Sequence, residues 1–419
     1  MLSPADSDLV ERDVGLPGLA TLLDPVAFVD AWRRHSGDAA VADAALTYLR
    51  YKPGTNCIAA YRIRSAQASR CVYAKAFGAD AADKLQKARG RLPGIVCGNL
   101  GIAAFAFPAD AKLRTLSRLA VPARRRALLT RIFDGSEAHR DGALDPLAYK
   151  PERRYVARFE PANGTGAVLK FYAPEGFPAA ARSCKAFASR GVLRIPRKSG
   201  GSKRHRILAF EWLRGAPLRE ILADPAADVG VLARVGAALG ELHAQGDASL
   251  ARRSAPADTV KLLELATTLG FLCPSLASRA AALAARVAAS LAGTAGVPRA
   301  IHGDFYDKQV LVGAERIAIL DLDQAAWGDP RSDLGLFVAH LERDCLLGRL
   351  DAARFAAAAG ELVEGYQQTA GVPVAGLGVH VADGLLRLAH HPFRGHMPGW
   401  PDATARILDR VDEILAGPR

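Results

Sequence analysis

The stretch IHGDFYDKQVLVGAERIAILDLDQ, residues 301–324, places four aspartates beside two short apolar runs. The aspartates are Asp304, Asp307, Asp321 and Asp323, and one amide, Gln309, follows the first of them by five residues. The apolar runs, QVLV and IAIL, are separated by the polar turn GAER and therefore predict a tight β-hairpin. We expect this hairpin to bring Asp304, Gln309 and Asp321 to one edge.

Carboxylates gathered in this way repel one another in a low dielectric, and a bound divalent cation removes the repulsion. Ligands that offer only oxygen select a hard ion such as Mg²⁺ or Mn²⁺. The candidate ligands at this edge are Asp304, Gln309 and Asp321, and Asp323 is either a further ligand or a solvated supporting acid. A metal ion with a separate carboxylate near an incoming hydroxyl group is the minimum equipment for phosphoryl transfer.

Strand patterns are concentrated before residue 213, and helical patterns dominate after it. Helical patterns cover residues 20–47 (one or two helices), 80–90, 177–190, 226–244, 260–270, 277–292, 333–346, 351–370, 378–390 and 402–416. The segments RAIHGD, QVLV and IAILDLD are the exceptions in the second half and read as short strands or loops. This order predicts an α+β fold in which a sheet-rich lobe precedes a helical lobe.

Two blocks in the first half resemble each other, and both predict strand, turn and strand. They are residues 48–77 and 148–172, and each contains the tripeptide Tyr-Lys-Pro, at 51–53 and at 149–151. The second strand of each block carries an embedded lysine, Lys75 in the first and Lys170 in the second. We interpret the blocks as a degenerate internal repeat; the alternative is a chance match of a short tripeptide.

Composition excludes several classes of protein. The 419 residues are half hydrophobic, which predicts a globular chain with a sizeable core. The net charge is +12, but the basic residues are scattered and no zinc-finger or RNA-binding motif is present, so we expect no nucleic-acid partner. Six cysteines without a Cys-x-x-Cys pair argue against a zinc ribbon and a disulfide framework. With no secretory signal and no apolar span at 279–293, we expect a cytoplasmic protein without a membrane partner.

The motifs HGDFYDKQ and ILDLDQAAWGDPRSDLG together resemble the signature of the aminoglycoside phosphotransferase and choline kinase group, which has a protein-kinase-like fold. The matching residues are His302, Gly303, Asp304, Asp321, Asp323, Gly328, Asp329, Pro330, Asp333 and Leu334. The resemblance extends less tightly over residues 148–345. There LAFEWLRGAPL looks like the family's hinge and VGAALGELHAQG looks like its first large-lobe helix.

The resemblance implies a role for each matching residue. Asp304 would be the catalytic base, or the carboxylate that orients the acceptor hydroxyl. Asp321 would hold Mg²⁺ against the phosphates of ATP. Lys170 would neutralise the α- and β-phosphates, and backbone groups of Glu211, Trp212 and Leu213 would receive the adenine.

The sequence departs from the family pattern at two places. Gln309 stands where the family has Asn, and its side chain is longer by one bond, about 1.5 Å. We expect the Gln309 amide still to serve as a ligand, directly or through a water molecule. The helix after Lys170 contains no acid to pair with that lysine, and Glu175 lies just before it. Either Glu175 substitutes or the lysine is held otherwise.

Several motif residues also have plain structural interpretations. We expect His302 to hold its loop by hydrogen bonds, Asp333 to anchor that loop, and Asp329 to cap a helix. Asp307 and Lys308 are expected to face solvent.

The predicted domains are residues 1–140, an extra α+β cap, 141–212, a small nucleotide-binding lobe, and 213–419, a helical lobe with the catalytic and acceptor site. The predicted function is transfer of the γ-phosphoryl group of ATP or GTP to a hydroxyl of a sugar, aminoglycoside or amino alcohol. The alternative is a catalytically weak or inactive nucleotide-binding protein with a regulatory or partner-binding role. The sequence does not choose the acceptor, ATP over GTP, or an oligomeric state.

Overall fold

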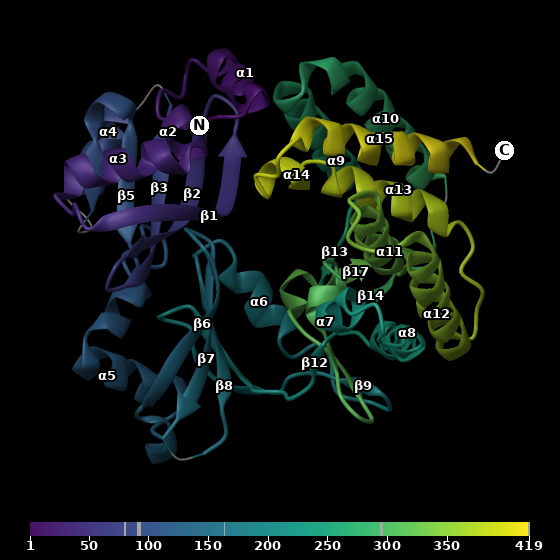
Figure 1. The fold of residues 1–419 in the computed structure, drawn as a ribbon. Helices are drawn as coiled ribbons and strands as arrows, with labels where there is room; N and C mark the ends of the chain where they lie inside the picture. The colour runs from purple at the N-terminus through teal and green to yellow at the C-terminus, as the bar shows by residue number, and fades with distance from the viewer. Residues whose placement is uncertain (79–80, 90–93, 163, 294–295, 418–419) are drawn as a thin grey trace. The chain divides into compact units, whose positions relative to one another are not determined.

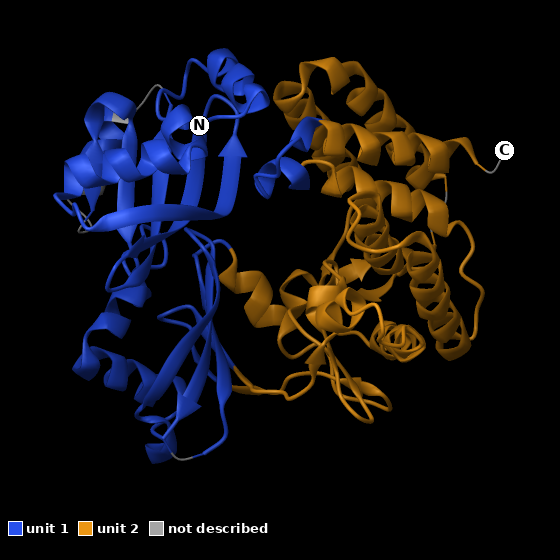
Figure 2. Cartoon of the chain, in the orientation of Figure 1, with its two compact units in different colours: residues 1–175, 200–209, 391–401 blue, residues 176–199, 210–390, 402–419 orange. Residues whose placement is uncertain are grey.

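A computed structural model of the chain describes residues 1–78, 81–89, 94–162, 164–293 and 296–417. The chain forms two compact units, coloured separately in Figure 2. Unit 1 contains Met1–Glu175, Gly200–Ala209 and His391–Pro401, and unit 2 contains Gly176–Ser199, Phe210–His390 and Asp402–Arg419. The three-domain division of the sequence stays a prediction.

Unit 1 is built around two five-stranded sheets, which have the same kind of strand order. The first sheet has the order β1-β2-β3-β5-β4 and the second has the order β10-β11-β8-β7-β6. Figure 1 labels β1, β2, β3 and β5 of the first sheet and β6, β7 and β8 of the second. The strands of the first are β1 Val41–Lys52, β2 Asn56–Ser65, β3 Ser69–Phe77, β4 Ile95–Cys97 and β5 Ile102–Ala106. Those of the second are β6 Gly142–Lys150, β7 Arg154–Pro161, β8 Ala167–Tyr172, β10 Lys198–Ser202 and β11 Ile207–Glu211.

Short helices accompany these sheets. They are α1 Pro4–Arg12, α2 Leu19–Leu23, α3 Pro25–Ser36, α4 Ala81–Arg89, α5 Pro122–Ile132 and α14 His391–Arg394. The start of α3 is fixed by Asp24, whose side chain accepts the N–H of Val26 at 2.9 Å, and its end by Gly37 with φ of 71°. The helix buries Phe28 and Trp32 and packs against β1.

The expected helical stretch 20–47 is wrong in its last part. Helix α3 ends at Ser36, and the Ala-rich residues from Val41 onward form strand β1 instead. Strand β1 pairs with β2 along its length, with Leu49 opposite Ala59 and Tyr51 opposite Cys57. Cross-strand packing therefore overrides the helix propensity of alanine in this segment.

Unit 2 is mainly helical, as expected for the second half of the chain. Its helices are α6 Phe177–Ser183, α7 Leu218–Ala223, α8 Val231–His243, α9 Ala255–Leu272, α10 Ala277–Ala292, α11 Arg331–Leu346, α12 Ala352–Ala370, α13 Leu377–Leu388 and α15 Trp400–Ala416. The closest helix pairs are α8 with α12, α11 with α13, and α9 with α10. A Cβ on Gly365 would overlap the carbonyl oxygen of Ala233, so glycine is what permits the close approach of α8 and α12.

Short strands lie among these helices. They are β9 Leu193–Arg194, β12 Ala216–Pro217, β13 Ala251–Arg252, β14 Arg299–Ile301, β15 Val310–Val312, β16 Ile317–Ile319 and β17 Ala326–Gly328. The hairpin expected over residues 309–320 is confirmed as β15 and β16, with Val310 opposite Ile319 and Val312 opposite Ile317. The α+β fold class is confirmed. Within the described ranges, no helix combines the length and the apolar character needed to cross a membrane.

Candidate active site

The loop that carries Asp304 follows strand β14 and is tied to the end of the β15–β16 hairpin. His302 is fully buried, and its Nε2 lies 2.7 Å from the carbonyl oxygen of Leu320. The N–H of Asp304 donates to Nδ1 of His302 at 3.2 Å, so Nδ1 is the acceptor and Nε2 carries the proton. A neutral imidazole satisfies both contacts. The expected structural role of His302 is therefore what the geometry supports.

Leu320 is also bound from the other side, because its N–H donates to the carbonyl oxygen of Gln309 at 2.8 Å. The residue that precedes Asp321 is thus held both by His302, two residues before Asp304, and by the backbone of Gln309. These bonds connect the three segments that were expected to meet at one edge.

Asp333, near the start of α11, fixes the backbone of the same loop. Its Oδ2 accepts the N–H of His302 at 2.6 Å, and its Oδ1 accepts the N–H of Gly303 at 2.8 Å. Nε2 of His243 lies 3.0 Å from Oδ2. Gly303 has φ of 83°, and a Cβ there would overlap the carbonyl oxygen of Gln324. The anchoring role expected for Asp333 therefore has a direct geometric basis.

Asp333 is buried, which by itself raises its pKa. The hydrogen bond and the charge of His243, together with the N–H of Gly303, outweigh burial and lower the pKa overall. A carboxylate with a lowered folded-state pKa stabilises the fold above its ordinary pKa of about 4. That contribution is lost as the pH falls through the folded-state pKa.

Replacing Asp333 with Asn is expected to lower the free energy of unfolding by about 3–5 kcal/mol, because it breaks a buried charged network on one side. Urea unfolding at pH 7 measures this loss. The difference from the wild type should shrink in acid, where Asp333 is protonated. The matched control is Asp409→Asn, because Asp409 forms an exposed ion pair with Arg279; it should cost less than about 1 kcal/mol. Equal free energies of unfolding for the two variants would contradict the anchoring role of Asp333.

Asp321 occupies the left-handed region, with φ of 62° and ψ of 51°, two residues after the end of β16. Glycine adopts this conformation most easily, although aspartate tolerates it better than most residues. The role of Asp321 as a metal ligand stays a prediction. Asp323 lies in the short 3₁₀ helix Leu322–Gln324 and is half-buried.

The catalytic candidate Asp304 is exposed, whereas the neighbouring Tyr306 is half-buried. Burial is the main cause that raises the pKa of Tyr306 to about 12, and the charges of Asp304, Asp321 and Asp307 add to it. Asp304 and Asp321 therefore lie close enough to act on the same phenol.

The donor atoms near this edge suit a hard cation. Gln309 is 7 % exposed, and its side-chain amide makes no hydrogen bond to another described residue. The side chains predicted to hold the ion, Gln309, Asp321 and Asp323, offer only oxygen ligands of the kind that Mg²⁺ prefers. No cluster of three or more His, Cys, Asp or Glu ligands occurs in the described part of the chain. A site made of two carboxylates and one amide contains only two ligands of these types and would not be such a cluster.

The expectation that Asp307 faces solvent is wrong. Asp307 is buried and forms a two-point ion pair with Arg219 of α7, at 2.8 Å from Nε to Oδ2 and 3.1 Å from Nη2 to Oδ1. Sequence reasoning missed Arg219, because nothing local marks a partner 88 residues away. Lys308 is exposed, as expected. The expectation that Asp329 caps a helix is wrong in detail, because the N-cap of α11 is Pro330; Asp329 lies one residue earlier and accepts the N–H of Arg331 at 2.9 Å.

The candidate nucleotide residues lie elsewhere in the chain. Lys170 is on β8 in unit 1. Glu175, the possible substitute acid, accepts a hydrogen bond from Lys112 at 2.7 Å. In the hinge segment, the N–H of Glu211 donates to the carbonyl oxygen of Arg197 at 2.9 Å. Trp212 and Leu213 follow in a segment without regular structure, and both are half-buried.

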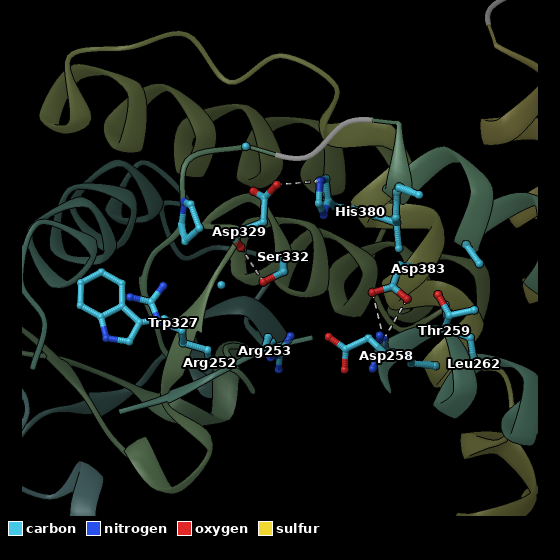
Figure 3. A pocket seen from close by; sticks show the side chains of 17 residues that line it. Arg252, Arg253, Asp258, Thr259, Leu262, Trp327, Asp329, Ser332, His380 and Asp383 are labelled. Atoms are coloured by element: carbon cyan, nitrogen blue, oxygen red, sulfur yellow. Dashed lines mark hydrogen bonds and ion pairs between the residues drawn. The ribbon is translucent and has the colours of Figure 1, made fainter. Parts of the chain in front are cut away.

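A pocket of about 290 Å³ in unit 2 is shown in Figure 3. Its walls come from α9, α10, α13 and the strands β13 and β17, and they include Trp327, Asp258, Asp383 and Arg387. Arg253, which also lines it, donates from Nη2 to the carbonyl oxygen of Gly303 at 2.8 Å. One wall of the pocket is therefore bonded to the residue before Asp304.

Known proteins resemble this chain in sequence and in fold. The family model described as "Phosphotransferase enzyme family" matches residues 149–372. Aminoglycoside phosphotransferase APH(4)-Ia is 18% identical, with a TM-score of 0.50, over 72% of this chain and 100% of that one.

Two further solved structures have TM-scores of 0.47 and are also 18% identical. They are a choline/ethanolamine kinase family protein from Mesorhizobium loti (70% of this chain, 94% of that one) and a putative fructosamine-3-kinase from Thermobifida fusca (71% and 99%). No curated protein matches the sequence. The family model covers more than half of the chain, and the kinase-like fold expected from the motifs is confirmed. The chain belongs to the phosphotransferase enzyme family and is an enzyme that transfers phosphoryl groups to hydroxyl acceptors.

Proposed function

We propose that the chain transfers the γ-phosphoryl group of ATP or GTP to a hydroxyl of a small polyhydroxylated molecule, with Asp304 as the catalytic carboxylate. The observation that carries the proposal is the exposed Asp304 on a loop whose backbone is fixed by Asp333 and tied to the hairpin that presents Asp321. A fixed loop with an exposed carboxylate is the arrangement that a positioned base requires.

The reaction balances with the residues in these roles. The acceptor oxygen forms a bond to the γ-phosphorus, and the bond from that phosphorus to the β-γ bridging oxygen breaks. The proton of the acceptor hydroxyl goes to the Asp304 carboxylate, and the nucleoside diphosphate leaves. Asp304 orients the hydroxyl before transfer and holds its proton afterwards, before release to solvent.

Negative charge on the phosphates is the main obstacle to this reaction. Mg²⁺, held by Asp321 and Gln309 with Asp323 in support, would supply positive charge against the phosphate oxygens. Lys170 would neutralise the α- and β-phosphates. Leu213, whose backbone makes no hydrogen bond to another described residue, and the adjacent Trp212 would receive the base.

The pocket of Figure 3 supports a polyhydroxylated acceptor. The acids in its wall already have cationic partners: Asp383 with Arg387 at 2.9 Å, and Asp258 with Lys261 at 3.1 Å. A lining of paired charges beside the indole ring of Trp327 offers many hydrogen bonds and a flat apolar face, but little net charge. This chemistry suits a sugar-like acceptor better than a highly charged one.

The proposal is tested by incubating the wild type with Mg²⁺, γ-labelled ATP or GTP, and a panel of sugars, aminoglycosides and amino alcohols. Label transferred to a panel compound, and lost in Asp304→Asn, is the expected result. Nucleotide binding without transfer to any compound, and without Asp304-dependent hydrolysis, would favour the regulatory alternative and contradict the proposal. Transfer to amino alcohols alone would leave the proposed phosphoryl transfer to a hydroxyl intact but overturn the sugar-like acceptor.

A further inference from the structure

The two sheets of unit 1 are alike in register as well as in strand order. Tyr51 pairs with Cys57 in the first hairpin, and Tyr149 pairs with Tyr155 in the second. Lys75 of β3 lies opposite Ile58, and Lys170 of β8 lies opposite Val156. Ile58 and Val156 are each the seventh residue after the tyrosine of their Tyr-Lys-Pro motif. Lys75 is therefore the positional equivalent of Lys170 in the first sheet.

Lys75 is bound to the second sheet. Its Nζ donates to Oε2 of Glu152 at 2.7 Å, and Nη2 of Arg50 lies 3.7 Å from the same oxygen. Glu152 is 5 % exposed and lies in the turn between β6 and β7, with φ of 58°. The side chain of Glu152 is thus held by two cationic residues of the first sheet, Lys75 and Arg50.

The backbone of the turn is held as well. Oδ2 of Asp110 accepts the N–H of Glu152 at 3.0 Å and the hydroxyl of Tyr149 at 2.8 Å. Oδ1 of Asp110 accepts the N–H groups of Lys112 and Leu113, both at 2.8 Å, which fixes the carboxylate itself. The turn is therefore fixed at its side chain, its backbone and its flanking tyrosine.

The charges of the residues in the β6–β7 turn show the effect of holding the turn in this way. The turn reads Lys-Pro-Glu-Arg-Arg over residues 150–154, and Glu152 is the one acid among three cations. Glu152 is buried against Lys75, so its negative charge is not presented on the surface of the turn. Lys150 and Arg153 are exposed. Opposite residues in an antiparallel pair point to the same face. Arg154, which lies opposite Tyr172, therefore shares a face with Lys170, and both side chains are half-buried.

We propose that Lys75 and Glu152 form a clamp through which the first sheet positions the basic β6–β7 turn, beside Lys170, to bind the nucleotide phosphates. The inference rests on the proposed function and assigns the first sheet a task within it. Lys75 and Glu152 are positioning residues, because the ion pair acts through Lys150, Arg153 and Arg154.

The test compares the wild type with Lys75→Met, Glu152→Gln and the charge exchange Lys75→Glu/Glu152→Lys. Each is measured for KM of ATP, kcat, KM of the acceptor and thermal unfolding. Both single variants should raise KM of ATP about tenfold, the size of one lost charge-assisted contact, with kcat and KM of the acceptor within about threefold of the wild type. The charge exchange should recover part of the loss. Arg126→Met is the matched control, because it breaks an exposed ion pair with Asp141 in the same unit.

The possible outcomes distinguish a failure of the clamp proposal from a failure of the proposed function. If the wild type neither binds ATP nor transfers phosphate, the proposed function fails, and the clamp fails with it. If the wild type is active and Glu152→Gln, which keeps the shape of the side chain but removes its charge, retains the wild-type KM for ATP, the clamp alone is overturned. A lower unfolding temperature with unchanged KM in every folded variant shows a purely structural ion pair and also overturns it. Should Lys75→Met not fold, Glu152→Gln decides.

Discussion

Replacing Asp304 with Asn is expected to lower kcat by about 10²- to 10⁴-fold, the range that a positioned general base contributes. Asn keeps the shape of the side chain but cannot take up the proton of the acceptor hydroxyl. The affinity for nucleotide should stay within about threefold of the wild type, because Asp304 acts on the acceptor. Steady-state kinetics with a panel substrate, combined with direct titration of a non-hydrolysable nucleotide, measure both quantities.

The variant should fold normally. Asp304 is exposed, and the backbone of its loop is fixed by Asp333 through the N–H groups of His302 and Gly303. Glu315→Gln is a matched control, since it removes a carboxylate from the exposed turn between β15 and β16. A kcat of Asp304→Asn equal to that of the control would show that another group handles the proton.

Replacing Asp321 with Asn is expected to remove several kcal/mol of charge stabilisation from the transition state, which corresponds to about 10²- to 10⁴-fold in kcat/KM. Unlike Asp304→Asn, this variant should also bind nucleotide more weakly in the presence of Mg²⁺ and need more Mg²⁺ for half-maximal activity. The difference arises because Asp321 holds the ion that screens the phosphates.

Asn is the informative substitution at this position. It adopts the left-handed conformation of Asp321 readily, so the backbone should be undisturbed and the unfolding temperature should change little. An Asp321→Asn variant with the magnesium dependence and nucleotide affinity of the wild type would rule out Asp321 as a metal ligand. Loss of folding in this variant would instead assign the carboxylate a structural role.

Residues close in sequence were the predictable part of the site. The two apolar runs with a polar turn predicted the β15–β16 hairpin, and with it the nearness of Gln309 and Asp321. Because His302 precedes Asp304 by two residues, its role in holding the loop also followed from the motif. Such predictions succeed because a tight hairpin leaves few alternatives for neighbouring residues.

Partners far apart in the chain could not be predicted. Arg219 neutralises Asp307, and His243 bonds to Asp333, but each pair is brought together by helix packing that no local pattern specifies. The same limit applies to Glu152 as the partner of Lys75. The weak repeat pointed to two similar sheets, yet gave no sign that one would hold a turn of the other.

The measurement that tests the central claim most directly is a crystal structure with a non-hydrolysable ATP analogue and Mn²⁺, analysed for anomalous scattering. The account predicts an ion in contact with the phosphates, the Asp321 carboxylate and the Gln309 amide oxygen, and an Asp304 carboxylate open to the acceptor pocket. An ion bound without Asp321, or an Asp304 walled off from that pocket, would contradict it.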